Sequence, residues 1–184
     1  MNLPQAFLER INKNYPDEAN KLIHSISNTQ APVSIRINSK KINPNIQFYG
    51  KVIDWNNKGR FLDKRPIFTL DPLYHAGVYY AQEASSMILE KVLEKIELNS
   101  DFLALDLCAA PGGKSLILSD WLANNGLLIS NEVIATRAKI LKENCIKWGC
   151  NNVLVSNSDP KKIAKSGVNF DLILIDAPCS GEGL

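Results

Sequence analysis

The segment from Phe102 to Ser119, FLALDLCAAPGGKSLILS, constrains the fold of this chain most. A short apolar run ends at Asp106, a turn of small residues and glycine follows, and a second apolar run begins at Leu116. This order predicts a buried strand, a tight turn and the start of a helix. In such a unit the backbone N–H groups at the helix N-terminus face an anionic or polar ligand. The turn is therefore the first candidate binding site.

Three further apolar runs repeat this plan along the chain. They are Leu127–Ile129, Val153–Val155 and Leu172–Ile175, and a helical pattern through Ala138 and Trp148 separates the first two. Strands that alternate with helices favour a doubly wound parallel sheet. We therefore expect an α/β, Rossmann-like domain over residues 71–184, opened by an amphipathic helix from Met87 to about Asn99.

The sequence stops soon after its fourth predicted strand. Buried parallel strands need neighbours and cover on both faces. We therefore expect this domain to be truncated and the chain to be a fragment of a longer protein.

Residues 1–70 show a different pattern. Apolar residues recur at helical spacing on either side of Tyr15–Pro16, which predicts two short helices. Val33, Ile35 and Ile37 then alternate with polar residues, which predicts a half-buried strand whose polar groups face outward. We expect a small α+β domain here, ahead of the Rossmann-like one.

Charge is divided unevenly between these two parts. Residues 1–70 hold 11 Lys and Arg against 5 Asp and Glu, whereas residues 71–184 hold 10 against 14. Between Asn43 and Leu73 aromatic residues lie among the basic ones. Cations can hold phosphates and aromatic rings can stack on bases, which favours nucleic acid as a partner. A solvated basic face over an aromatic core explains the same pattern.

Membrane and metal partners are disfavoured by composition. No apolar run reaches membrane-spanning length and the N-terminus lacks the layout of a signal peptide, so we expect a cytoplasmic protein without a membrane partner. The four cysteines form no CxxC pair and only two histidines are present, so we expect neither zinc nor another metal. Reduced cysteines, mostly packed in the core, are the expectation for Cys145 and Cys150.

Two kinds of nucleotide site fit the glycine turn poorly. The dinucleotide motif G-x-G-x-x-G is absent, because Gly112 and Gly113 are adjacent. Gly113-Lys114-Ser115 matches the end of a P-loop, but Cys108 stands where its first glycine belongs. Pro111 also removes an N–H donor that should bind phosphate. A P-loop-like NTPase is therefore the weaker alternative.

A methyl donor that carries adenosine fits better. Glu132 follows the second predicted strand, where a carboxylate can accept hydrogen bonds from both ribose hydroxyls. Asp159 follows the third strand and could bind the adenine amino group, and Asp176 ends the fourth. Since the carboxyl ends of parallel strands share one edge, these acids should meet beside the glycine turn.

Cys179 follows Asp176 after one alanine and one proline. The C5 carbon of cytosine becomes nucleophilic when a thiolate adds to C6, and a carboxylate at the ring nitrogen would assist. A nearby carboxylate raises a thiol pKa, so other charges would have to activate such a cysteine. Cys179 is thus either this attacking thiol or a buried structural cysteine.

Five segments resemble the RNA cytosine-5 methyltransferases of the Nop2/Sun family, in particular the bacterial rRNA enzymes. They are CAAPGGK at 108–114, Asn131-Glu132 with Arg137 and Asn144, DAPCSGEG at 176–183, YAQEASS at 80–86 and SIRIN at 34–38. The resemblance implies that S-adenosylmethionine is the cofactor and RNA, in particular rRNA, the substrate. It also implies that residues 1–70 are an RNA-binding domain and residues 71–184 the first half of a methyltransferase domain.

The same resemblance implies roles for individual residues. The cofactor would be bound by Cys108, Ala109, Ala110, Pro111, Gly112, Gly113, Lys114, Glu132, Asp159 and Asp176. Asp176 and Cys179 would be catalytic, with Cys179 assisting breakdown of the covalent adduct and product release. The nucleophile would lie in a Thr-Cys segment beyond Leu184, so we expect this fragment alone not to methylate RNA. A non-catalytic RNA-binding module is the alternative from another class.

Overall fold

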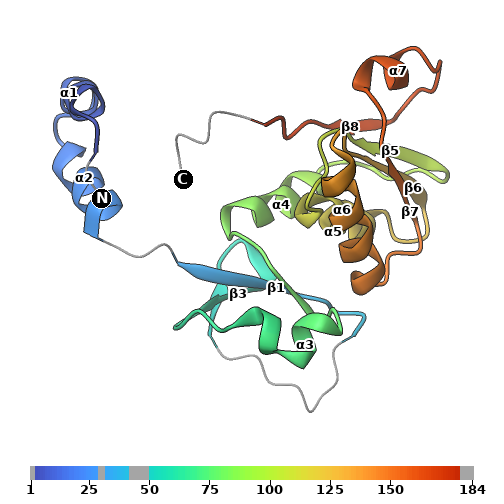
Figure 1. The fold of residues 1–184 in the computed structure, drawn as a ribbon, viewed down its shortest axis with the longest axis horizontal. Coiled ribbons are helices and arrows are strands. Elements are labelled where there is room, and N and C mark those ends of the chain that lie inside the picture. The colour runs from blue at the N-terminus through green and yellow to red at the C-terminus, as the bar shows by residue number, and fades with distance from the viewer. Residues whose placement is uncertain (1–2, 29–31, 42–49, 179–184) are drawn as a thin grey trace. The chain divides into compact units, whose positions relative to one another are not determined.

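Two helices form the first part of the structure. The computed structural model describes residues 3–28, 32–41 and 50–178 (Figure 1), and it divides into two units, residues 1–32 and 33–184. In the first unit, α1 spans Gln5–Asn14 and α2 spans Ala19–Asn28. The break lies at Tyr15–Pro16, because proline disfavours a helical conformation in the residue before it. The two helices predicted from the sequence are confirmed.

The second unit begins with an antiparallel sheet in the order β2-β3-β1-β4. Its elements are β1 (Val33–Ile37), β2 (Lys51–Ile53), β3 (Asn56–Leu62), the 3-10 helix η1 (Phe68–Leu70), α3 (Pro72–His75) and β4 (Tyr79–Ala81). Because β4 pairs with β1, this sheet crosses the boundary expected between residues 70 and 71. The assignment of RNA binding to residues 1–70 and of methyl transfer to residues 71–184 stays a prediction.

The polar side chains of β1 are buried, so the expectation that they face outward is wrong. Arg36 is fully buried, and its guanidinium lies 2.9 Å from Asp120 and 3.5 Å from Glu90. The same group lies over the ring of Trp148, 5.3 Å from the ring centroid. Because these partners neutralise and cover the cation, an arginine can occupy an interior position that the sequence pattern assigns to solvent.

Two of the aromatic residues between β1 and β4 belong to the core. Trp55 and Phe61 pack against a buried cluster of Ile53, Ala84 and Met87, and the Trp55 indole donates to the Ala84 carbonyl at 2.9 Å. For these two side chains the core interpretation holds. Phe48 and Tyr49 lie outside the described residues.

A parallel sheet in the order β7-β6-β5-β8 forms the rest of the second unit. Its elements are the 3-10 helix η2 (Ser85–Ile88), α4 (Leu89–Leu93), β5 (Phe102–Asp106), α5 (Gly113–Leu122), β6 (Gly126–Asn131), α6 (Ala135–Trp148), β7 (Val153–Ser156), α7 (Pro160–Ala164) and β8 (Leu172–Leu174). The four predicted strands and the Rossmann-like fold are confirmed. The strand order reverses between β5 and β8, which is where ligands bind in such sheets.

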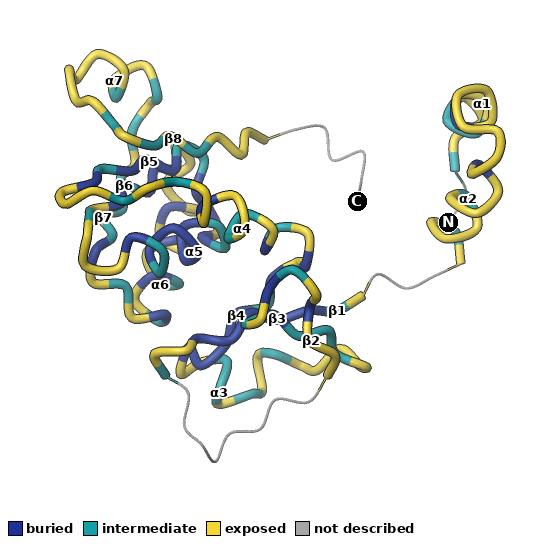
Figure 2. The backbone as a smooth tube through the Cα atoms, turned by 180° about the vertical axis from the view of Figure 1, so that it is seen from behind, coloured by how far each residue is buried: buried dark blue, intermediate teal, exposed yellow. Residues whose placement is uncertain are grey.

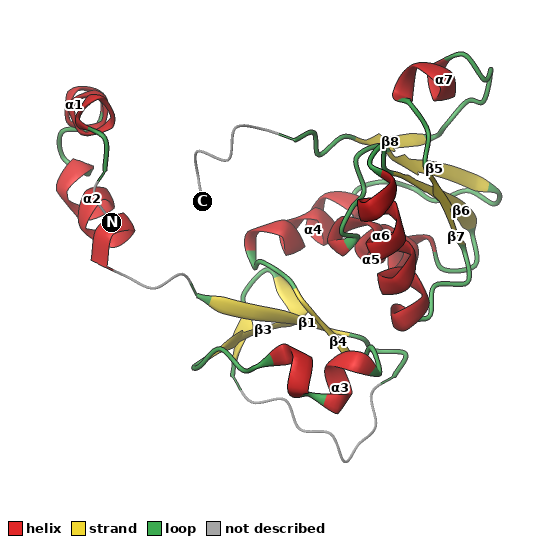
Figure 3. Cartoon of the chain, in the orientation of Figure 1, coloured by secondary structure: helices red, strands yellow, loops and turns green. Residues whose placement is uncertain are grey.

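Helices α4, α5 and α6 lie against one face of this sheet (Figure 3). Helix α5 is buried along most of its length (Figure 2), as expected of a helix with apolar residues around its whole circumference. Helix α4 ends at Leu93 rather than near Asn99. Its last turn tightens, because the N–H groups of Lys95 and Ile96 bond three residues back.

Candidate functional site

The glycine turn connects β5 to α5. β5 ends at Asp106 and α5 begins at Gly113, with Gly112 as its N-cap. Gly112 has φ +116°, a conformation that side chains other than glycine rarely adopt. The first backbone bond into the helix runs from Leu116 N to Gly112 O at 2.9 Å. The N–H groups of the preceding helical residues therefore remain directed toward the turn.

Helix α6 holds the turn from outside. Arg137 Nη2 donates to Ala110 O at 2.7 Å, and Asn144 Nδ2 donates to Pro111 O at 2.8 Å. At the end of β6, Asn131 O accepts from Ala109 N at 2.8 Å. Three consecutive residues of the turn are thus fixed by neighbouring elements, which leaves its shape independent of a ligand.

Asp106 is a buried carboxylate at the base of the turn, with 1% of its surface exposed. Its Oδ2 accepts from Ser115 Oγ at 2.7 Å, and Ser115 Oγ in turn accepts from Ser130 Oγ at 3.0 Å. Its Oδ1 has no hydrogen-bond partner within the described part of the chain. Burial raises the pKa of Asp106 from 3.8 to about 6, although the Ser115 hydrogen bond and the Lys114 charge oppose this.

Glu132 is a second buried carboxylate, 4% exposed, just after β6. Its Oε1 accepts from Ile134 N at 3.0 Å, and its Oε2 lies 3.4 Å from Arg137 Nη1. Arg137 therefore contacts both Glu132 and the turn carbonyl of Ala110. This shared partner fixes the carboxylate relative to the turn.

Three carboxylates converge on Cys108, the first residue of the sequence motif. Burial first, and then the charges of Glu132, Asp106 and Asp176, raise the pKa of the Cys108 thiol. Asp176 also forms an ion pair with Lys114, the second residue of α5. The structure thus brings Glu132 and Asp176 together with the turn, as the sequence predicts.

One predicted site residue, Asp159, stands apart from this group. Asp159 is exposed and caps α7, accepting from Lys161 N at 2.8 Å. It follows β7, one of the two edge strands of the sheet, and is not among the charges that shift the pKa of Cys108. Cys179 lies outside the described residues.

The sequence interpretation missed two polar residues at the turn, Asp106 and Gln82. Asp106 could have been found as a charged residue at the end of an apolar run. Gln82 lies in the YAQEASS segment that carries the family resemblance, but nothing in the sequence places that segment at the turn, and only the fold brings Gln82 against Gly113. Among the described residues, no helix is long and apolar enough to cross a membrane. No group of metal-ligating side chains occurs in the same ranges.

Comparison with known proteins agrees with this geometry. The family model for 16S rRNA methyltransferase RsmB/F matches residues 92–184, and that for the N-terminal domain of 16S rRNA methyltransferase RsmF matches residues 3–84. Ribosomal RNA small subunit methyltransferase F of Vibrio campbellii is 33% identical over 98% of this chain. The same enzyme of Shewanella loihica is 34% identical over 98% of this chain. The chain spans about 40% of the length of each of these relatives.

Solved structures share the fold over nearly the whole chain. A methyltransferase homologue from Pyrococcus horikoshii aligns with a TM-score of 0.80 and 29% identity, over 98% of this chain and 61% of that one. NSun6 from the same organism, crystallised with SFG, aligns with a TM-score of 0.76 and 18% identity, over 96% of this chain and 71% of that one, which supports the fold alone. Both halves of the sequence and the fold thus agree, and the chain belongs to the 16S rRNA methyltransferase RsmB/F family.

Proposed function

We propose that this chain supplies the cofactor-binding part, and part of the RNA-binding surface, of an S-adenosylmethionine-dependent rRNA cytosine-5 methyltransferase. The observation that carries this proposal is the glycine turn, which α6 fixes from outside and which faces three acidic side chains. Family membership and the named methyltransferase relatives support it. An rRNA substrate also agrees with the cytoplasmic location expected from the sequence.

The described residues fit S-adenosylmethionine by their chemistry. Asp106 has a buried carboxylate oxygen without a partner in the described ranges, and a cationic ammonium is a suitable partner for it. Glu132 would accept hydrogen bonds from the ribose hydroxyls, and Asp159 would accept one from the adenine amino group. The turn at 108–114 would hold the amino-acid end of the cofactor, with the N-terminus of α5 facing the carboxylate.

The catalytic roles that we propose are those implied by the resemblance to the cytosine-5 methyltransferases. The cofactor supplies an electrophilic methyl group, which C5 of cytosine accepts after a cysteine thiolate has added to C6. Asp176 would hydrogen-bond the ring nitrogen, while its ion pair with Lys114 holds the carboxylate in place. Cys179 would assist removal of the C5 proton, which allows the thiolate to leave. Cys108, whose thiol pKa is raised, is unsuited to either cysteine role.

RNA would bind to basic residues in and next to the antiparallel sheet of the second unit. Arg36 and Lys58 pair with carboxylates of this unit and are therefore poor candidates for phosphate contacts. Lys51, Lys64 and Arg65 are exposed and are the cations that we assign to RNA. Binding through them should weaken as salt concentration rises, because phosphate neutralisation releases counterions.

Calorimetric titration of the full-length protein with S-adenosylmethionine tests the proposal. Glu132→Gln keeps an acceptor for Ile134 N but loses the charge, so we expect affinity to fall roughly 10- to 100-fold, since hydrogen bonds to charged groups contribute about 1.5–3 kcal/mol. Glu143→Gln, which removes an exposed carboxylate of α6, is the matched control and should bind as the wild type.

The same titration separates the alternatives. A wild-type protein that binds RNA but no S-adenosylmethionine would favour a non-catalytic RNA-binding module. Binding of ATP in its place would favour the NTPase. Mapping of 5-methylcytosine in rRNA incubated with the full-length protein then tests the position of methylation.

A further inference from the structure

Gln82 is a buried amide whose polar atoms have no partner. Only 7% of its surface is exposed, and neither Oε1 nor Nε2 makes a hydrogen bond within the described residues. A buried polar group left in this state destabilises a fold by about 1–3 kcal/mol. Such groups are uncommon in native structures and often indicate a function.

The backbone of Gln82 is held firmly in place. Gln82 N donates to Ser34 O at 3.2 Å, and Gln82 O accepts from Ser34 Oγ at 2.6 Å. Both bonds come from β1, so the residue is fixed to the first sheet just after β4. Its unpartnered amide therefore does not result from a loose loop.

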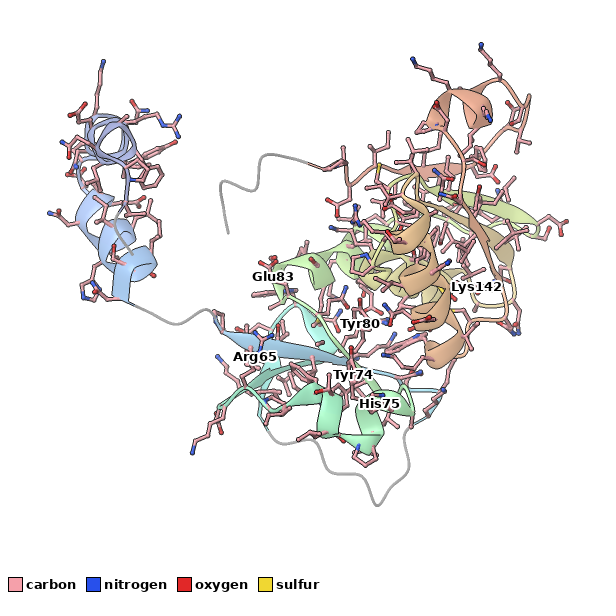
Figure 4. The ribbon with its side chains drawn as sticks, viewed as in Figure 1. Arg65, Tyr74, His75, Tyr80, Glu83 and Lys142 are labelled. Carbon is pink, nitrogen blue, oxygen red and sulfur yellow. The ribbon has the colours of Figure 1, made fainter. Side chains whose placement is uncertain are left out.

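The side chain of Gln82 reaches the first residue of α5. A Cβ atom added to Gly113 would lie 3.2 Å from Gln82 Nε2 and 3.4 Å from Tyr80 Cε1. Tyr80 lies between the first sheet and α6 (Figure 4), and it belongs to a buried apolar cluster that includes Leu141 and Trp148 of that helix. The amide is thus packed directly on the glycine turn, with the Tyr80 ring beside it.

Helix α5 has ten residues, and no side chain caps it within the described ranges. Its free N–H groups and its dipole favour a carboxylate at this end. An amide next to them adds one donor and one acceptor. A ligand group that itself carries a carboxylate and an ammonium matches this set, whereas a phosphate offers no donor for the amide oxygen.

We propose that Gln82 binds the amino-acid end of S-adenosylmethionine, donating from Nε2 to the carboxylate and accepting at Oε1 from the ammonium. This inference rests on the function proposed above and adds a contact residue that lies outside the Rossmann-like sheet. Gln82 then links the cofactor to the first sheet, because Ser34 of β1 fixes its backbone.

Two ligands distinguish this contact from a structural role. S-adenosylmethionine carries the amino-acid end, and 5′-methylthioadenosine has the same adenine, ribose and sulfur without it. In the full-length protein, Gln82→Met keeps the length of the side chain but cannot hydrogen-bond. We expect calorimetry to show a loss of S-adenosylmethionine affinity of roughly tenfold or more, and a change in 5′-methylthioadenosine affinity of less than about twofold.

The stability of the unliganded variant is a second readout. Gln82→Met removes a buried unpartnered amide, so its melting temperature should equal or exceed that of the wild type. Gln82→Glu places a negative charge beside the ligand carboxylate, so it should weaken S-adenosylmethionine binding further and spare 5′-methylthioadenosine.

Two results would overturn the inference alone: unchanged S-adenosylmethionine affinity in Gln82→Met, or an equal loss of affinity for both ligands. A wild-type protein that binds neither ligand would instead overturn the proposed function.

Discussion

Replacing Asp106 by asparagine should remove a large pH dependence of folding stability. The pKa of this buried carboxyl is raised from 3.8 to about 6, so between pH 4 and pH 6 the folded protein binds the proton more tightly than the unfolded chain does. The contribution of Asp106 to stability is therefore fully present below about pH 4 and is lost as pH rises through 6. A shift of roughly two units corresponds to about 3 kcal/mol.

The assay is urea unfolding of wild type and Asp106→Asn, followed by tryptophan fluorescence at pH 4 and pH 7.5. The difference in unfolding free energy between the two proteins should move by about 2 kcal/mol in favour of the variant over this range, because pH 4 lies slightly above the pKa of 3.8. Comparing the difference at two pH values cancels the pH-independent effects of the substitution. Glu97→Gln, at an exposed carboxylate of the same unit, controls for loss of one negative charge. A difference that stays constant to within about 0.5 kcal/mol would refute the reasoning.

Two further substitutions test how the second unit is held together, each by urea unfolding. Arg36→Met should lower the free energy of unfolding by about 3–5 kcal/mol, because it leaves the charge of Asp120 inside the protein with poorer compensation; a loss below about 1 kcal/mol would contradict this. Gly77→Ala should lower the free energy of unfolding by about 1–3 kcal/mol more than Gly167→Ala does. Both glycines have positive φ, so the backbone strain of an alanine is similar at the two positions. An added Cβ would lie 1.9 Å from Lys147 O at Gly77, whereas it meets nothing within 4 Å at Gly167. Equal losses in the two glycine variants would exclude the steric explanation.

The spacing of apolar residues and the positions of turn residues were sufficient to predict most of the fold. The apolar runs that begin at Phe102, Leu127, Val153 and Leu172 all overlap observed strands. Gly149 ends α6 in a left-handed conformation, as a glycine after an apolar helical pattern indicates. These signals succeed because each depends on residues that are close together in the sequence.

Only part of the candidate site could be predicted from the sequence in the same way. Glu132 and Asp176 could be placed at the turn, since strand ends share one edge of a parallel sheet. The missing partners of Asp106 Oδ1 and of Gln82 could not, because a hydrogen bond that is absent from the described structure is a property of all surrounding elements at once. For Asp159 the position after β7 was predicted, but the hydrogen bond that its side chain accepts from Lys161 N, as the N-cap of α7, was not.

The period of the alternation along β1 was predicted correctly, but the strand is buried on both faces rather than on one, and this has a functional consequence. Ser34, Arg36 and Asn38 are all buried, and together they contact several elements of the second unit. Ser34 holds Gln82 at the N-terminus of α5, and Arg36 pairs with Asp120 near the C-terminal end of that helix. Asn38 Nδ2 donates to Trp148 O at 2.8 Å, at the end of α6.

The polar face of β1 is thus an internal contact. Arg36 ties the C-terminal part of α5 to the first sheet, and Ser34 fixes the backbone of Gln82, whose side chain packs beside the first residue of α5. Because α5 begins at the glycine turn, a displacement of the first sheet must either carry the turn with it or break a buried ion pair at Arg36. The free energy needed to separate them favours movement as one body.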